Sequence, residues 1–126
     1  MRYKIELEYE LNCSPKAVFS RLSTPEGLNE WFADKVVAEK PLFTFTWDKI
    51  ESKAKLSAIK ENRLVRFEWL GMEDKNTNYF EFQILVHELT NDLALIVTDF
   101  SELDEQKDTI FLWDAQIAKL KRILGV

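Results

Sequence analysis

Two carboxylates in apolar surroundings carry the acid–base chemistry that this 126-residue chain could support. Asp99 lies in a segment with the apolar pattern of a strand, and Asp114 flanks the apolar stripe of a C-terminal helical segment. If either carboxyl group faced an apolar groove, desolvation would raise its pKa and suit it to the general acid or base step of a cyclase or lyase. The alternative is a solvated carboxylate, or an ion pair with a neighbouring lysine or arginine.

The single histidine and the single cysteine are the other candidates for a base or a nucleophile. His87 has the opposite parity from Phe82 and Ile84, which favours the outer face of a sheet or the end of the strand. Cys13 precedes the start of a helix, where a thiol pKa can be lowered, but no base partner is evident and an unreactive buried thiol is the alternative. These two residues cannot form an ordinary zinc site, and no phosphate-binding glycine motif is present. We therefore assign no catalytic residue, and we expect no metal and no cofactor.

Composition narrows the expected partners and the expected compartment. The chain has 17 Lys and Arg against 22 Asp and Glu, a net charge of -5, and such a field repels nucleic acid and anionic membrane surfaces. No apolar run approaches the roughly 18–20 residues that cross a bilayer, and the N-terminus alternates charged and apolar residues, unlike a signal peptide. We expect no nucleic-acid partner, no membrane insertion and a cytoplasmic location. Aromatic residues make up 13% of the chain, and they must be packed or must line a cavity.

Hydrophobic periodicity predicts one domain, residues 1–126, with both strands and helices. Alternation over 3–11 indicates a strand, and Ser14-Pro15 and Thr24-Pro25 each start a short helix. Strands are then expected at 42–47, 52–59, 64–70, 79–88 and 93–100, with a further short one near 36–38. The short connections favour an antiparallel meander. From residue 104 onward the period becomes helical, which predicts a helix of about 20 residues that stops at Gly125.

The long helix must cover the apolar face of this sheet, and it is too narrow to cover all of it. A helix is about 10 Å across, whereas a sheet of six or seven strands extends about 4.8 Å per strand. The remaining volume is either packed solid by aromatic side chains or left as a pocket. Alternation and helical spacing identify the residues expected to line a ligand pocket: Trp31, Phe32, Phe45, Trp47, Phe67, Trp69, Phe82, Ile84, Trp113 and Ile117. The alternative for each of them is a plain core residue.

The order of elements and the opening motifs are similar to those of a known family. Residues 3–32 resemble the Hsp90 ATPase activator homologues, within the START/Bet v 1-like (SRPBCC) superfamily. The shared features are an alternating strand, then Ser14-Pro15 with Val18, Phe19 and Leu22, then Thr24-Pro25-Glu26 with Leu28 and Trp31-Phe32, and finally a terminal helix with Trp113, Ile117, Leu120 and Leu124.

The resemblance implies an α+β helix-grip fold. In that fold a curved antiparallel sheet of six or seven strands wraps a long C-terminal helix, and two short helices follow the first strand. Members of the superfamily bind lipids, sterols or polyketides, or act as cyclases or chaperone regulators. Phe19 stands where family members often have Trp, and no segment resembles the separate Hsp90-binding domain of the eukaryotic activator. The chaperone role is therefore not carried over.

Three functions are compatible with these features. The first expectation is a non-enzymatic module that holds a small hydrophobic molecule, lipid-like or polyketide-like, between sheet and helix. The second is a cyclase-type enzyme that uses acids in the groove. The third is a protein-interaction domain with a filled core, whose outer surface, including residues 71–78, contacts a partner. A cavity with few polar groups would favour the first of these functions.

Overall fold

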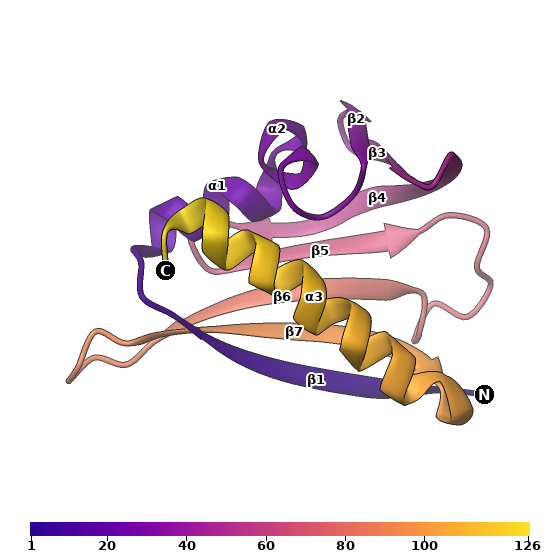
Figure 1. Ribbon diagram of the computed structural model, residues 1–126. Coiled ribbons are helices and arrows are strands. Elements are labelled where there is room, and N and C mark those ends of the chain that lie inside the picture. The colour runs from indigo at the N-terminus through magenta and orange to yellow at the C-terminus, as the bar shows by residue number, and fades with distance from the viewer.

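A seven-stranded antiparallel sheet forms the body of the computed structural model, which describes residues 1–126 (Figure 1). The elements in chain order are β1 (Arg2–Leu11), α1 (Pro15–Ser23), α2 (Pro25–Asn29), β2 (Lys35–Glu39), β3 (Leu42–Trp47), β4 (Ile50–Lys60), β5 (Leu64–Trp69), β6 (Tyr79–Val86), β7 (Leu93–Glu102), a 3-10 turn η1 (Leu103–Glu105) and α3 (Gln106–Leu124). In space the strands run β1-β7-β6-β5-β4-β3-β2. Strands β2 to β7 form a meander, and β1 extends it by pairing with β7 as an edge strand. The predicted helix-grip fold is confirmed.

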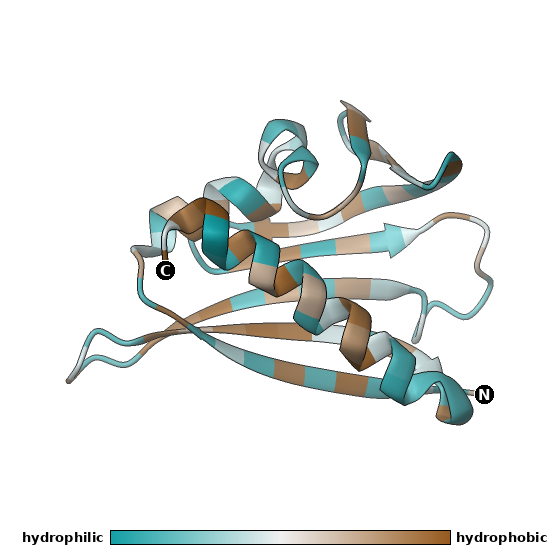
Figure 2. Ribbon diagram, in the orientation of Figure 1, coloured by the Kyte–Doolittle hydropathy of each residue, from teal (hydrophilic) through white to brown (hydrophobic).

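Helix α3 lies diagonally across one face of the sheet, with its first turns over β1 and β7 and its last turns near α1 (Figure 1). Its buried residues Trp113, Ile117 and Leu120 belong to the predicted stripe. The helix stops at Gly125, which has a φ of 76°, a left-handed conformation that favours glycine, and donates its N–H to the carbonyl of Arg122. Apolar and polar residues alternate along β1, as expected for a strand with one buried face (Figure 2). No helix in the structure has the length and apolar character needed to span a membrane.

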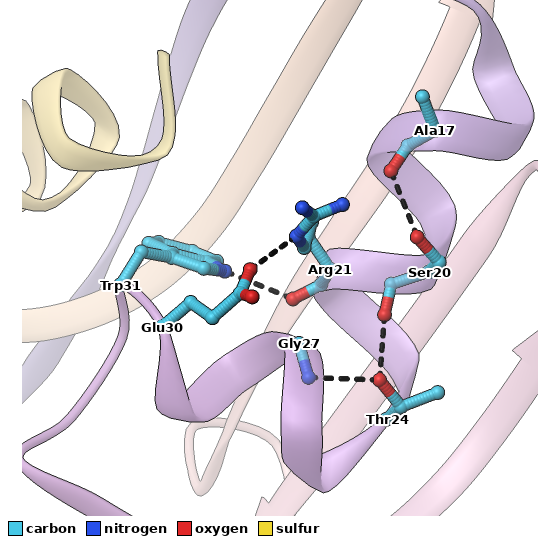
Figure 3. A network of polar contacts seen from close by, with 7 residues as sticks. All are labelled: Ala17, Ser20, Arg21, Thr24, Gly27, Glu30 and Trp31. Carbon is cyan, nitrogen blue, oxygen red and sulfur yellow. Dashed lines mark hydrogen bonds and ion pairs between the residues drawn. The ribbon is translucent and has the colours of Figure 1, made fainter. Parts of the chain in front are cut away.

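The junction of α1 and α2 fixes the path of the chain into the sheet (Figure 3). Thr24 serves both helices, because its hydroxyl donates to the Ser20 carbonyl at 2.7 Å and accepts from the Gly27 N–H at 3.0 Å. The Trp31 indole donates to the Arg21 carbonyl at 2.9 Å, and Arg21 and Glu30 form an ion pair. These contacts hold the turn after α2, and they therefore set where Trp31 and the next residue lie.

One expected face assignment on β4 is wrong. The alternation predicts that Ala54, Leu56 and Ala58 share a face, but the register with β5 shifts between Leu56 and Ala58. Leu56 pairs with the buried Phe67, whereas Ala58 pairs with Arg66, whose side chain forms an ion pair with Glu81. A bulge places one extra residue in a strand and reverses the parity beyond it. Ala58 therefore shares the outer face with Arg66.

Aromatic side chains make up much of the core beneath α3. Five phenylalanines on β3, β5 and β6 are at most 1% exposed, namely Phe43, Phe45, Phe67, Phe80 and Phe82. Their rings meet in stacked and edge-to-face pairs, for example Phe67 and Phe80 with centroids 5.1 Å apart. The centre of the groove is therefore filled by the chain itself, and any cavity must lie toward one end.

Candidate functional site

A cavity of about 410 Å³ lies between the sheet and the first half of α3. It forms at the end of the sheet where β3, β5 and β7 finish and β6 begins. The diagonal course of α3 carries its first turns toward β1 and β7 and away from β3 and β5 at this end (Figure 1). The lining residues are Phe32, Trp47, Trp69, Phe80, Asp99, Thr109, Leu112, Trp113 and Gln116. The groove is therefore neither empty throughout nor packed solid.

Five aromatic rings around the cavity form a closed circuit. Ring centroids are 5.2 Å apart for Phe32 and Trp47, 6.3 Å for Trp47 and Trp69, and 5.0 Å for Trp69 and Phe80. The circuit closes through Trp113, which lies 6.3 Å from Phe80 and 5.8 Å from Phe32. Phe32 and Phe80 also stack directly on each other, with centroids 5.3 Å apart, so the five side chains form one continuous wall. We name these five residues together the aromatic ring of the cavity.

Hydrogen bonds to the carbonyl of Phe32 connect three segments of the chain at the wall of the cavity. The Phe32 carbonyl accepts from the Trp47 indole N–H at 2.9 Å and from the Gln116 amide at 2.7 Å. The segment after α2, the end of β3 and the middle of α3 thus meet at one oxygen. Because the Gln116 amide donates to this carbonyl, its role here is to hold the wall of the cavity.

Asp99 is the sole ionisable residue that lines the cavity. Its Oδ2 accepts from the Trp113 indole N–H at 2.8 Å, and its Oδ1 accepts from the Phe100 N–H at 2.8 Å. Burial raises the pKa of Asp99 above its ordinary value, against the opposing effects of these two hydrogen bonds and of the positive charge of Arg2. A carboxylate is thus held at the cavity wall by a residue of the aromatic ring.

The raised pKa predicts how Asp99 affects stability as the pH changes. A group whose pKa is higher in the folded chain keeps its proton on folding, so its contribution is greatest below the ordinary value of 3.8 and is lost as the pH rises through the folded pKa. We therefore expect the wild type to lose stability relative to Asp99→Asn as the pH rises from about 3 to about 7. Urea denaturation at stepped pH measures this difference. A difference that stays constant, or that grows in favour of the wild type, would contradict the assignment.

The cavity opens at its outer side into a wider hollow of about 570 Å³. The two share Trp47, Trp69, Asp99 and Thr109. The hollow is more polar, and the residues found only there include Arg2, Ser52, Lys53, Leu70, Met72, Glu102 and Glu105. Arg2 spans part of it, donating to the Phe100 carbonyl at 2.7 Å and to the Met72 sulfur at 3.3 Å. A molecule could therefore reach the aromatic ring from this end of the sheet.

The residues expected to bind a ligand fall into two groups in the structure. Phe32, Trp47, Trp69 and Trp113 line the cavity. The remaining six are 5% exposed or less and lie in the core around it, namely Trp31, Phe45, Phe67, Phe82, Ile84 and Ile117. The lining residues that were not expected are Phe80, Thr109, Leu112 and Gln116. Phe80 has the parity of Phe82, and Thr109 and Gln116 lie at helical spacing from Trp113, so periodicity carried a signal for these three.

The two acids considered for catalysis lie in different places. Asp99 faces the cavity, whereas Asp114 is exposed and accepts from the Tyr9 hydroxyl at 2.7 Å. Burial is the main cause that raises the pKa of Tyr9, and its hydrogen bond to Asp114 adds to the effect. These two acids therefore do not converge on one site.

The candidate nucleophile and the histidine also lie away from the cavity. Cys13 is half-buried, and burial raises the pKa of its thiol, which makes the reactive thiolate less available. His87 is exposed just after β6, where its backbone N–H donates to the backbone carbonyl of Asp92. No group of three or more His, Cys, Asp or Glu side chains is placed to hold a metal ion.

Comparisons with known proteins find similarity over nearly the whole chain. A family model described as a START-like superfamily domain matches residues 1–126. A protein from Bacteroides fragilis, solved by NMR in solution, is 44% identical, with 97% of this chain and 90% of that one covered and a TM-score of 0.69. The Aha1 dimer from Colwellia psychrerythraea is 18% identical, with 98% and 97% covered and a TM-score of 0.81. A protein from Mesorhizobium loti is 17% identical, with the same coverage and a TM-score of 0.77. No match was found among curated proteins.

Proposed function

This chain belongs to the START-like superfamily, and we propose that it is a non-enzymatic module that binds a small hydrophobic molecule between its sheet and α3. The observation that carries the proposal is the cavity of about 410 Å³ with five aromatic side chains in its wall. Binding pockets for small molecules typically enclose about 300–1,000 Å³ and combine an apolar wall with few polar groups. The cavity meets both criteria.

The position of the polar groups favours binding over the cyclase alternative. An acid–base mechanism of the expected kind needs at least two polar groups that converge on a substrate. In the cavity, Gln116 donates to the Phe32 carbonyl, and the Thr109 hydroxyl donates to the Glu105 carbonyl. Asp99 is left as the single acid, so a role in holding a ligand accounts for the wall more simply than a role in converting one.

Three finer assignments belong to this proposal. The first is membership of the family of Hsp90 ATPase activator homologues, and it is supported by the sequence motifs of residues 3–32. The second is a lipid-like or polyketide-like ligand, supported by the largely aromatic wall. The third is a cytoplasmic protein without a nucleic-acid partner, supported by the net charge of -5.

A neutral apolar probe tests the proposal directly. We expect N-phenyl-1-naphthylamine to bind with a rise in its fluorescence, and to bind Trp69→Ala about tenfold more weakly, because this change removes an aromatic side chain that lines the cavity. Native mass spectrometry of the protein purified from its own host should in addition show a co-purified small molecule.

The matched control is Phe111→Ala, which removes an aromatic side chain from the same helix at a site that is 72% exposed and outside the cavity wall. Its affinity for the probe should equal that of the wild type. An equal loss in both variants would point to surface adsorption, and the absence of both probe binding and a co-purified molecule would overturn the proposal.

A further inference from the structure

We infer that the cavity selects an organic cation, an ammonium group carried on an apolar body, over neutral and anionic molecules of the same shape. This inference rests on the proposed function, since it concerns the occupant of the same cavity. It is carried by two independent features of the wall, the Asp99 carboxylate and the aromatic ring.

The first feature is the loss of water around the Asp99 carboxylate when a ligand occupies the cavity. A molecule that fills the cavity removes water from this carboxylate, whose protein partners are the Trp113 indole N–H and the Phe100 N–H. The positive charge of Arg2 acts on Asp99 from outside the cavity wall, and two neutral donors stabilise a desolvated carboxylate less than a countercharge in contact with it does. A neutral ligand would force Asp99 to take up a proton, and an anionic ligand would add repulsion. An ammonium group in the cavity would place a countercharge in contact with the carboxylate.

The second feature is the sign of the field that aromatic rings produce. The faces of indole and phenyl rings carry negative charge, and they attract cations within about 6 Å of the ring centroid. Trp47 and Trp69 are half-buried and line both the cavity and the outer hollow, so an incoming molecule meets them first. Trp113 touches Asp99 through its indole N–H. The aromatic ring and the carboxylate therefore favour the same charge.

The charges of the outer hollow do not oppose a cation. Three carboxylates there, Asp99, Glu102 and Glu105, balance Arg2, Lys53 and the N-terminal ammonium group of Met1, which pairs with Glu102 at 3.1 Å. The Arg2 guanidinium donates to the Phe100 carbonyl and to the Met72 sulfur, and Arg2 is absent from the wall of the inner cavity. The charges around the approach to the cavity therefore balance, and the net charge of the chain as a whole is -5.

Three probes with one chain length separate the possible occupants. Octyltrimethylammonium, 1-octanol and octanoate can be titrated into 15N-labelled protein at neutral pH, with the Trp113 indole N–H followed by NMR. We expect octyltrimethylammonium to bind about tenfold more tightly than 1-octanol, octanoate to bind most weakly, and the Trp113 signal to shift because its acceptor Asp99 gains a countercharge.

The matched pair of variants is Asp99→Asn and Asp114→Asn, which remove the same charge at sites inside and outside the cavity. The ratio of cation to alcohol affinity should fall to about threefold in Asp99→Asn, where only the aromatic side chains still favour a cation, and stay near tenfold in Asp114→Asn. An equal fall in both variants would assign the preference to overall charge, and a ratio that stays near tenfold in Asp99→Asn would show that the carboxylate plays no part in it. Either result would overturn the inference.

A further variant keeps the test decisive if Asp99→Asn does not fold. Trp69→Leu retains an apolar side chain and breaks no indole hydrogen bond found in the structure, and it should lower the same ratio by about threefold or more. Equal binding of all three probes, or tightest binding of octanoate, would overturn the inference and leave the proposed function standing. If none of the three binds, both fail.

Discussion

Phe32→Ala is expected to lower the free energy of unfolding by about 3–5 kcal/mol, a large share of the roughly 5–15 kcal/mol that stabilises a domain. The Phe32 side chain is 3% exposed, and its ring contacts those of six aromatic residues, including Phe45 at 5.0 Å and Phe80 at 5.3 Å. Removing the ring opens a void at the point where the core meets the cavity, and these neighbours are already fixed by one another. Urea denaturation followed by far-UV circular dichroism measures the loss.

Phe111→Ala is the control for this prediction, since Phe111 has the same side chain but is 72% exposed on α3. Its free energy of unfolding should stay within about 0.5 kcal/mol of the wild type. If Phe32→Ala costs no more than this control, Phe32 is not the junction of core and cavity that the ring contacts indicate.

Gly27→Ala is expected to destabilise the chain by about 1–3 kcal/mol, although alanine is the better helix former. A Cβ at position 27 would overlap the Ser20 carbonyl oxygen and lie 2.6 Å from the Arg21 Cα and 2.8 Å from the Thr24 hydroxyl. Two of these three atoms are backbone, so α1 and α2 must separate to admit a methyl group (Figure 3). The unfolding free energy gives the size of the effect, and the NMR signal of the Trp31 indole N–H, which donates to the Arg21 carbonyl, reports the separation.

The neighbouring change Glu26→Ala is the control for Gly27→Ala. Glu26 is exposed in the same short helix, and its truncation should cost about 0.5 kcal/mol or less. A Gly27→Ala variant as stable as the wild type, with an unmoved Trp31 signal, would show that the two helices do not meet as closely as the structure indicates.

Both predictions concern the segment that joins the helices to the cavity. Gly27 allows α2 to pack closely on α1, and the turn after α2 then presents the Phe32 carbonyl to Trp47 and Gln116. A change at Gly27 should therefore reach the cavity wall through this carbonyl. We expect the Trp47 indole N–H signal to move in Gly27→Ala as well.

The elements themselves could be predicted from the sequence because their causes are local. Alternation over β1 and the two Ser/Thr-Pro pairs placed the first strand and the two short helices close to their observed bounds. The bulge in β4 was not predicted, because it depends on the register with β5, and the adjacent apolar pair Ala58-Ile59 does not by itself say where a residue is inserted. The expected face of Ala58 was wrong for this reason.

The sequence by itself determined the residue types of the site, a surplus of aromatics that alternation assigns to one face and an acid, Asp99, in an otherwise apolar strand. Only the tertiary structure decided which of them surround a cavity: Phe45, Phe67 and Phe82 became solid core, whereas Trp47, Trp69 and Asp99 line the opening. The physical reason is that periodicity assigns a side chain to a face but not to a position along the groove. That position depends on the angle at which α3 crosses the sheet, and this angle is set by contacts between residues far apart in the chain.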